Sequence, residues 1–246
     1  MFHFLSMQTT LFQSPAVDVR VLRDRLRAVF GAIRAADRLD PIDQFVRSFI
    51  AGQTYDRVSW DAFWRLARHF RSWEALADAP VAAIATQLEG VAYGEKKAPE
   101  LARALRKIRV RAGALDLYFL ADHPVEQGLR WLEEIDGVGR HVSAATLNFS
   151  TLKKRAVVVN GHVLRVLKRF GFVDTRADTR EAYDAVMAAA DGFDADDLYE
   201  LHWYLKNLGQ RTCTFSCALC VSCPLSDVCL RRIEAGAETV TRARVA

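Results

Sequence analysis

Apolar side chains recur every three to four residues along most of the chain. This spacing, which gives a helix one apolar face, runs through the segments Val21–Ile33, Ile42–Ile50, Trp60–Phe70, Val81–Leu88, Ala98–Val110, Val125–Glu134, Val142–Ser150, Val163–Phe170, Ala182–Ala190 and Asp197–Leu208. The alternation of a half-buried strand is missing, and the β-branched run Val157–Val159 is too short to build a sheet. The pattern predicts an all-α protein.

Length and composition place few further limits on this picture. The chain has 246 residues, of which 51% are hydrophobic, so it can form one large domain or two lobes around a packed core. No apolar run is long enough to span a bilayer. The stretch Met1–Pro15 lacks the basic start and long apolar centre of a signal peptide. We therefore expect a cytoplasmic protein.

Charge is unevenly distributed along the chain. The net charge is only +4, but the acidic residues concentrate between positions 174 and 197. Basic residues form two groups, Lys96, Lys97, Arg103, Arg106, Lys107, Arg109 and Arg111, and then Arg140, Lys153, Lys154, Arg155, Arg165, Lys168 and Arg169. Solvated helix faces could account for both groups. Separation of sign along the chain favours a surface that binds a polyanion.

All five cysteines lie within one short segment. Cys213, Cys220, Cys223 and Cys229 are separated by six, two and five residues, and Cys217 is a spare that could replace one of them. Soft thiolates so close together select an iron–sulfur cluster or zinc. Because a zinc ribbon usually has two distant Cys-x-x-Cys pairs, the spacing favours a cluster, with zinc and disulfides as the alternatives.

A second motif is the pair of glycines in the segment Leu132–Leu147. Gly137 and Gly139 lie between two helical patterns, where glycine allows a tight turn and a close approach to a partner. Backbone amides at the start of the following helix can bind a phosphate, and Arg140 adds positive charge there. An ordinary turn between helices is the alternative interpretation.

Together these motifs resemble the helix-hairpin-helix DNA glycosylases, and endonuclease III in particular. The resemblance covers Pro41–Arg231 and depends on four segments, Phe49–Asp56, Ile135–Arg140, Val158–Val166 and His202–Cys229. They are similar to the family's first barrel segment, its hairpin, the segment with the catalytic aspartate, and the last helix with the cluster loop. The cysteine spacing and the hairpin are the most specific of these.

The resemblance implies a two-lobed all-α fold. A six-helix barrel lobe would span residues 41–152, and an iron–sulfur lobe would combine residues 153–246 with the N-terminal arm and helix of residues 1–40. The four cysteines would bind a [4Fe–4S] cluster. Double-stranded DNA would lie between the lobes of a monomer, with a damaged base flipped out. The implied DNA contacts are Gln53, Ala92, Tyr93, Gly137, Gly139, Arg140, Lys153 and Lys154.

Two positions depart from the family pattern. His141 occupies the place of the lysine with which bifunctional members form a Schiff base, so lyase chemistry by that route is not expected. Asn160 occupies the place of the catalytic aspartate, and a neutral amide neither stabilises a cationic transition state nor activates water well. His162, His202 and Trp203 match positions that we expect to pack helices, the last two against the cluster lobe.

Three explanations of these departures remain open. The chemistry could have moved, with His141 as a base that titrates near neutrality, Asp136 or Asp56 as the charge, and Asn160 as an orienting group. The protein could bind lesions or DNA structures without cleaving them, or Asn160 could deamidate because glycine follows it. We expect a monofunctional glycosylase of base excision repair. The alternatives are a non-catalytic binding protein and a redox-sensing DNA-binding protein.

Overall fold

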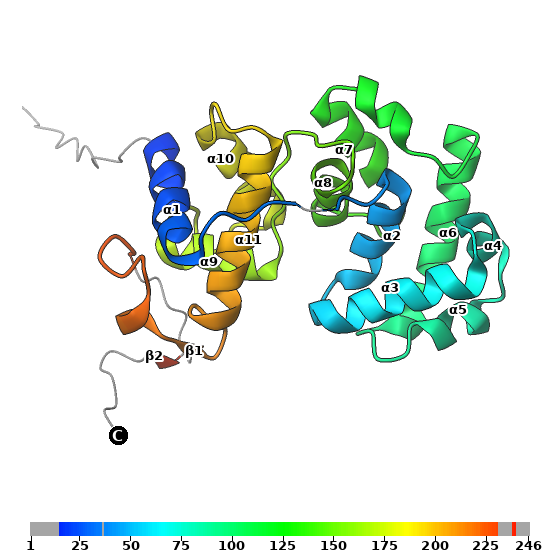
Figure 1. The fold of residues 1–246 in the computed structure, drawn as a ribbon, viewed down its shortest axis with the longest axis horizontal. Coiled ribbons are helices and arrows are strands. Elements are labelled where there is room, and N and C mark those ends of the chain that lie inside the picture. Colours follow the sequence, from blue (N-terminus) through cyan, green and yellow to red (C-terminus); the bar gives the residue numbers. More distant parts are fainter. Residues whose placement is uncertain (1–14, 36, 231–237, 240–246) are drawn as a thin grey trace, which may run out of the picture.

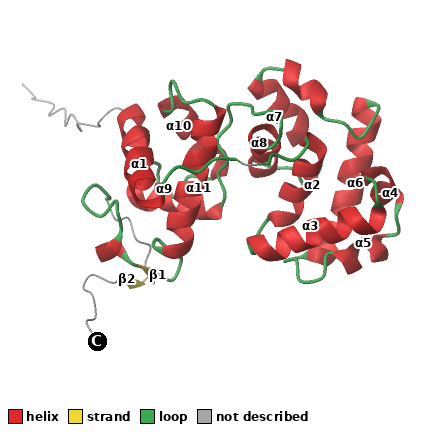
Figure 2. Cartoon of the chain, in the orientation of Figure 1, coloured by secondary structure: helices red, strands yellow, loops and turns green. Residues whose placement is uncertain are grey.

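The computed structural model of the chain describes residues 15–35, 37–230 and 238–239. These residues form α1 (Pro15–Phe30), α2 (Pro41–Ala51), α3 (Asp56–Phe70), α4 (Trp73–Asp78), α5 (Val81–Gln87), α6 (Gly94–Ala112), α7 (Val125–Glu133), α8 (Arg140–Phe149), α9 (Gly161–Phe170), α10 (Thr179–Ala189) and α11 (Ala195–Arg211). Short 3-10 turns span Tyr118–Asp122 and Cys220–Ser222. The strands β1 (Cys217–Ala218) and β2 (Glu238–Thr239) pair in parallel (Figure 2). The all-α prediction is confirmed, and most of the predicted N-terminal arm lies outside the described residues.

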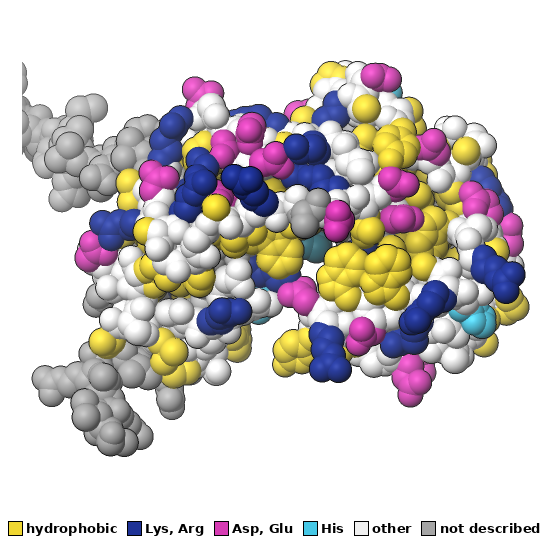
Figure 3. All heavy atoms as spheres, viewed as in Figure 1, with side chains coloured by type: hydrophobic (Ala, Val, Ile, Leu, Met, Phe, Trp, Pro, Cys, Tyr) yellow, Lys and Arg dark blue, Asp and Glu magenta, His cyan; other side chains and the backbone are white. Residues whose placement is uncertain are grey.

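The helices gather in two lobes that lie side by side (Figure 1). In one lobe, α2 and α7 pack on α8, while α4 and α5 pack on α6. In the other lobe, α11 packs on α9, and α1 packs on α10 and α11. This second lobe therefore combines an N-terminal helix with the C-terminal part of the chain. Within residues 15–35, 37–230 and 238–239, every helix is too short or too polar to span a lipid bilayer. The surface is hollowed between the two lobes (Figure 3).

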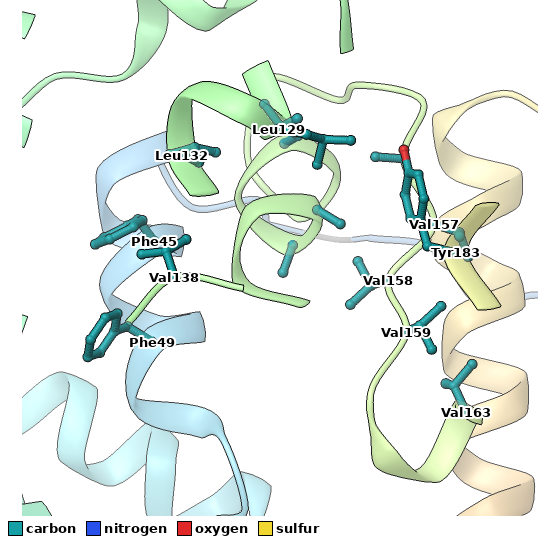
Figure 4. Packing of buried hydrophobic residues seen from close by; sticks show 14 of the residues in the cluster. Phe45, Phe49, Leu129, Leu132, Val138, Val157, Val158, Val159, Val163 and Tyr183 are labelled. Carbon is teal, nitrogen blue, oxygen red and sulfur yellow. The ribbon is translucent and has the colours of Figure 1, made fainter. Parts of the chain in front are cut away.

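The connection between α8 and α9 passes through the interior of the protein. Val157, Val158 and Val159 are each at most 1% exposed, and the hydrophobic cluster of Phe45 and Leu129 includes them (Figure 4). Burial on all sides therefore explains this run of three valines, to which neither helix nor strand is assigned. The connection ends at the cleft, where α9 begins.

Candidate active site and cluster loop

A cleft of about 1130 Å³ lies between the lobes. One wall comes from α2, the loop of residues 52–55 and the start of α3, and the opposite wall comes from α9 and α11. Side chains of α8 lie between these walls. Residues from both lobes therefore face one space, although long stretches of sequence separate them.

Asp56 is the carboxylate around which the cleft's charges are arranged. It is the first residue of α3, and its Oδ1 lies 2.7 Å from Lys206 Nζ and 4.0 Å from Arg47 Nη2. Burial opposes its ionisation, but Lys206, together with Gln210 and Arg47, outweighs burial and lowers the pKa of this carboxyl. The start of a helix also favours a negative charge. Asp56 is therefore an anion at neutral pH.

Lys206 is a site residue that the sequence analysis missed. Lys206 is 7% exposed, and its Nζ lies 4.3 Å from the centre of the Trp203 ring. Burial lowers the pKa of this amine, while Asp56 raises it, with the decrease prevailing. A signal was present in the sequence, because residues 202, 203 and 206 share one face of a helix. That signal could not show that the face meets Asp56 of the other lobe.

Two histidines of the cleft are neutral over the physiological range. Burial, reinforced by the charges of Lys206 and Arg47, lowers the pKa of His141 to about 4. Burial lowers the pKa of His202 to about 3, and its Nδ1 donates a hydrogen bond to the carbonyl of Val158 at 2.7 Å. The expectation that His141 titrates near neutrality is therefore wrong, because it lies in a desolvated site beside two cations.

The cleft also gives His202 and Trp203 a different environment from the one expected. Both line the cleft and pack on Phe149 of the barrel lobe, with ring centres 5.0 and 6.3 Å from it. They do not serve only to pack α11 against its own lobe. Together with Tyr199, whose ring centre is 5.1 Å from that of Phe149, they form an aromatic wall.

Asn160 lies at the start of α9 and lines the cleft. Its Oδ1 accepts a hydrogen bond from the backbone amide of Val163 at 3.0 Å, so the side chain caps the helix. His162 also lines the cleft, and its Nδ1 lies 3.2 Å from an Arg165 guanidinium nitrogen. Asn160 therefore faces the site while its oxygen serves the helix.

Asp136 lies away from these groups. Its side chain is 86% exposed, it is 3.8 Å from Lys107 Nζ, and it is not among the residues that line the cleft. The structure thus brings three of the four catalytic candidates to the cleft, namely Asp56, His141 and Asn160. Asp136 belongs to the outer surface of the hairpin turn.

The hairpin exposes backbone rather than the guanidinium of Arg140. Gly137 and Gly139 are exposed, and a φ of 84° at Gly137 requires the left-handed region that glycine favours. The Arg140 side chain is only 5% exposed, since its Nε lies 2.6 Å from Glu133 Oε1 and its guanidinium covers the Tyr183 ring at 4.5 Å. The expected phosphate contact by this side chain is not what the structure shows, because burial commits the charge to Glu133.

The loops that carry the implied DNA contacts Gln53 and Tyr93 are adjacent and joined to each other. Gln53 and Tyr93 are exposed and both have a φ of 57°, a left-handed conformation that is uncommon outside glycine. The amide of Ala92 donates to Thr54 Oγ1 at 3.2 Å. Lys97 Nζ donates to two carbonyls at the end of α2 at 2.9 and 2.6 Å, and burial lowers its pKa to about 8. Gln53 lines the cleft, whereas Ala92 and Tyr93 do not.

The two lysines expected to contact DNA already have partners within the chain. Lys153 Nζ lies 2.9 Å from Asp196 Oδ2, although about half of the lysine side chain is exposed. Lys154 donates to the carbonyls of Ala121 and, at 3.0 Å, His123. Neither lysine lines the cleft. Their amines stabilise the connection after α8.

The cysteines lie in the loop that follows α11. All five are in the described part of the chain, none forms a disulfide, and Cys213, Cys223 and Cys229 pack against the hydrophobic core. Burial raises the pKa of the Cys223 thiol, and the nearby charges of Cys213, Cys229 and Cys220 raise it further. No group of His, Cys, Asp or Glu side chains in the described ranges is arranged as a metal-ion site.

The surroundings of these thiols suit an anionic cluster. Arg169 is buried, and its Nη1 lies 3.7 Å from Cys213 Sγ, while the Cys229 thiol donates to the Arg169 carbonyl at 3.5 Å. The four thiols are close enough to influence one another's charge, a buried guanidinium lies beside one of them, and hydrophobic residues pack behind them. Four cysteine thiolates are the donor set of an iron–sulfur cluster. Cys213, Cys220, Cys223 and Cys229 are the residues that would hold it.

The architecture matches solved structures of an endonuclease III–DNA complex and of a thymine-DNA glycosylase. An endonuclease III–DNA covalent intermediate aligns with a TM-score of 0.71 and 19% identity, over 87% of this chain and 95% of that one. A thermostable thymine-DNA glycosylase aligns with a TM-score of 0.67 and 15% identity, over 88% of this chain and 95% of that one. At such identities the likeness concerns the fold alone.

Sequence relatives and a family model agree with this fold. The DNA glycosylase/AP lyase ROS1 of Arabidopsis thaliana is 25% identical over 171 residues, which cover 64% of this chain but 12% of that protein. The adenine DNA glycosylase of Schizosaccharomyces pombe is 30% identical over 111 residues, which cover 44% of this chain and 24% of that protein. The HhH-GPD model matches residues 46–190. The chain belongs to the HhH-GPD superfamily of base excision DNA repair proteins.

Proposed function

We propose that the chain is a DNA glycosylase that hydrolyses the N-glycosidic bond of a damaged or modified base in duplex DNA. The observation that best supports this function is the anionic Asp56 on the wall of a cleft that both lobes form. Loss of a base leaves an oxocarbenium-like sugar, which a nearby carboxylate stabilises. Asp56 supplies that charge here, in place of the carboxylate that Asn160 lacks.

The other residues of the cleft support this assignment. The aromatic wall of Tyr199 and Trp203 offers ring faces for a flipped base. Gln53 lies in a left-handed turn that lines the cleft. From there it can fill the space that a flipped base leaves in the DNA stack. His141 is neutral and orients groups by hydrogen bonding, because its pKa of about 4 leaves it little basicity. Catalysis by a hairpin amine is not part of the proposal.

The cluster belongs to the same proposal. We infer that Cys213, Cys220, Cys223 and Cys229 hold a [4Fe–4S] cluster, which would supply structural cross-linking of the loop that follows α11. Arg169 would balance its negative charge, since a buried guanidinium already lies beside Cys213 Sγ. The cluster takes no part in the base chemistry proposed for the cleft.

A panel of lesion-bearing duplexes tests the proposal. The full chain is expected to leave an abasic site, revealed by cleavage with hot alkali, on at least one substrate. Asp56→Asn is expected to lower that rate by about 10²-fold or more, while Asp61→Asn on the outer face of α3 has no effect. Asn160→Asp is expected to raise the rate by restoring a carboxylate. Tight lesion binding without any abasic product would support a non-catalytic binding protein instead.

A further inference from the structure

Lys206 stands out among the lysines of the chain. The seven lysines all lie in the described ranges, and Lys206 alone lines the cleft. It is also the only lysine of the described chain that is buried. The partly buried Lys97 donates instead to the carbonyls at the end of α2. A buried primary amine that lines a cleft is a nucleophile for carbonyl carbon once it is deprotonated.

The surroundings of Lys206 lower the pKa of its amine and provide a proton acceptor. The groups that face it from neighbouring elements are Asp56 of α3, Arg47 of α2, His141 of α8 and His162 of α9. The histidines are held mainly neutral, and Arg47 lies 4.0 Å from the same Asp56 oxygen. Arg47 can therefore stabilise the Asp56 carboxylate again after Asp56 has accepted the proton of Lys206 and passed it on. The 2.7 Å contact gives that proton a direct path to the carboxylate.

We propose that Lys206 forms a Schiff base with the aldehyde of an abasic site and that the chain nicks DNA there as a β-lyase. The amine comes from α11 of the second lobe, not from the hairpin position, which holds His141. The inference rests on the proposed function for the placement of DNA in the cleft. It adds a second activity, on the product of base removal, to the hydrolysis proposed above.

The step is balanced without an oxidant or a reductant. Lys206 Nζ, after transferring a proton to Asp56, attacks C1′ of the ring-opened sugar and gives a carbinolamine. Asp56 returns its proton to the carbinolamine hydroxyl, which leaves as water to give an iminium ion and restores the carboxylate. A base in the cleft, for which Asp56 is the candidate, removes a C2′ proton. The C3′–O bond then breaks and the 3′ phosphate leaves with the bonding electrons. Water hydrolyses the iminium ion and restores the amine.

A purely structural role for the pair is the competing explanation. Lys206 and Asp56 join the two lobes, so their contact could serve only to hold the cleft in shape. The two roles differ in a covalent signature, because reduction of an iminium ion links protein and DNA permanently. They differ also in pH dependence, since only a reacting amine makes the rate follow its own protonation.

The test uses the full chain and a duplex with a preformed abasic site, so that it does not depend on base removal. Sodium cyanoborohydride is expected to trap a protein–DNA adduct, and peptide mapping is expected to locate it at Lys206. Lys206→Arg should abolish the adduct. The matched variant Lys107→Arg, which alters an amine beside Asp136 on the outer surface, should retain it. Asp56→Asn should shift adduct formation to lower pH, because Asp56 raises the pKa of Lys206.

The outcomes separate the two proposals. Absence of an adduct from the unmodified chain, or an adduct mapped to another lysine, overturns the assignment of Lys206 whatever the lesion panel shows. An adduct at Lys206 without base removal from any lesion supports the lyase and refutes the glycosylase. Because mapping uses the unmodified chain, the result stands even if Lys206→Arg folds poorly. Binding to a tetrahydrofuran abasic analogue checks that each variant still recognises DNA.

Discussion

Replacement of Arg140 by alanine tests whether this hairpin residue stabilises the fold or contacts DNA. Its side chain is 5% exposed and forms an ion pair with Glu133, whose own side chain is 11% exposed. Removing one member of a buried pair costs about 3–5 kcal/mol, because the other charge stays desolvated. Glu133 would keep Arg180 at 2.5 Å and Ser143 at 3.0 Å. We therefore expect a loss near the lower end, about 3 kcal/mol of unfolding free energy.

Urea unfolding followed by circular dichroism measures this loss. The control is Arg180→Ala, which removes the other guanidinium from the same carboxylate but from a side chain that is 55% exposed. Such a surface pair contributes about 0–1 kcal/mol. Comparison of the two variants shows how much of the loss in unfolding free energy comes from the burial of the ion pair and how much from the ion pair itself.

DNA binding provides the second measurement for Arg140. Loss of a phosphate contact would reduce the slope of log affinity against log salt by about one. The buried position predicts an unchanged slope at a temperature where the variant is folded. A stability loss below about 1 kcal/mol together with a reduced salt slope would refute the structural assignment and restore the phosphate contact.

Three further predictions follow from other parts of the molecule. His141 and His202 are neutral in the folded protein, so they contribute fully to stability above the unfolded pKa of 6.5. As the pH drops toward their folded pKa values of about 4 and 3, the free energy of unfolding should fall by up to about 1.4 kcal/mol per pH unit for each histidine. Urea unfolding between pH 7 and 5 should show this dependence, with a shallower slope in His141→Gln. Lys97→Met leaves two carbonyls at the end of α2 without their amine and should cost about 1–3 kcal/mol of unfolding free energy. The same variant should speed amide exchange in the loops that carry Gln53 and Tyr93, and unchanged exchange would contradict the link between these loops. Cys220→Ser should strip iron and sulfide from the purified chain, whereas Cys217→Ser should retain both; iron retained in the first variant would remove Cys220 from the ligand set.

Much of the secondary structure and the family could be recognised from local patterns. Apolar residues at helical spacing predict helices because each helix must bury one face, and this requirement acts within a few turns of chain. The glycines at 137 and 139 predict a tight turn for an equally local reason, since a positive φ at Gly137 depends on its own missing side chain. The four cysteines are close in sequence, so they are also close in space.

The site depended on contacts between distant parts of the chain. Asp56 and Lys206 are 150 residues apart, and their 2.7 Å contact exists only because α3 and α11 face each other across the cleft. Burial likewise reversed the expectations for Arg140 and His141, since sequence records the type of a charged group but not its solvation. The helices, the hairpin and the cysteine loop could be predicted from the sequence, because their causes are local. Only the tertiary structure decided which charges share the cleft, because desolvation and long-range packing set their pKa values and partners.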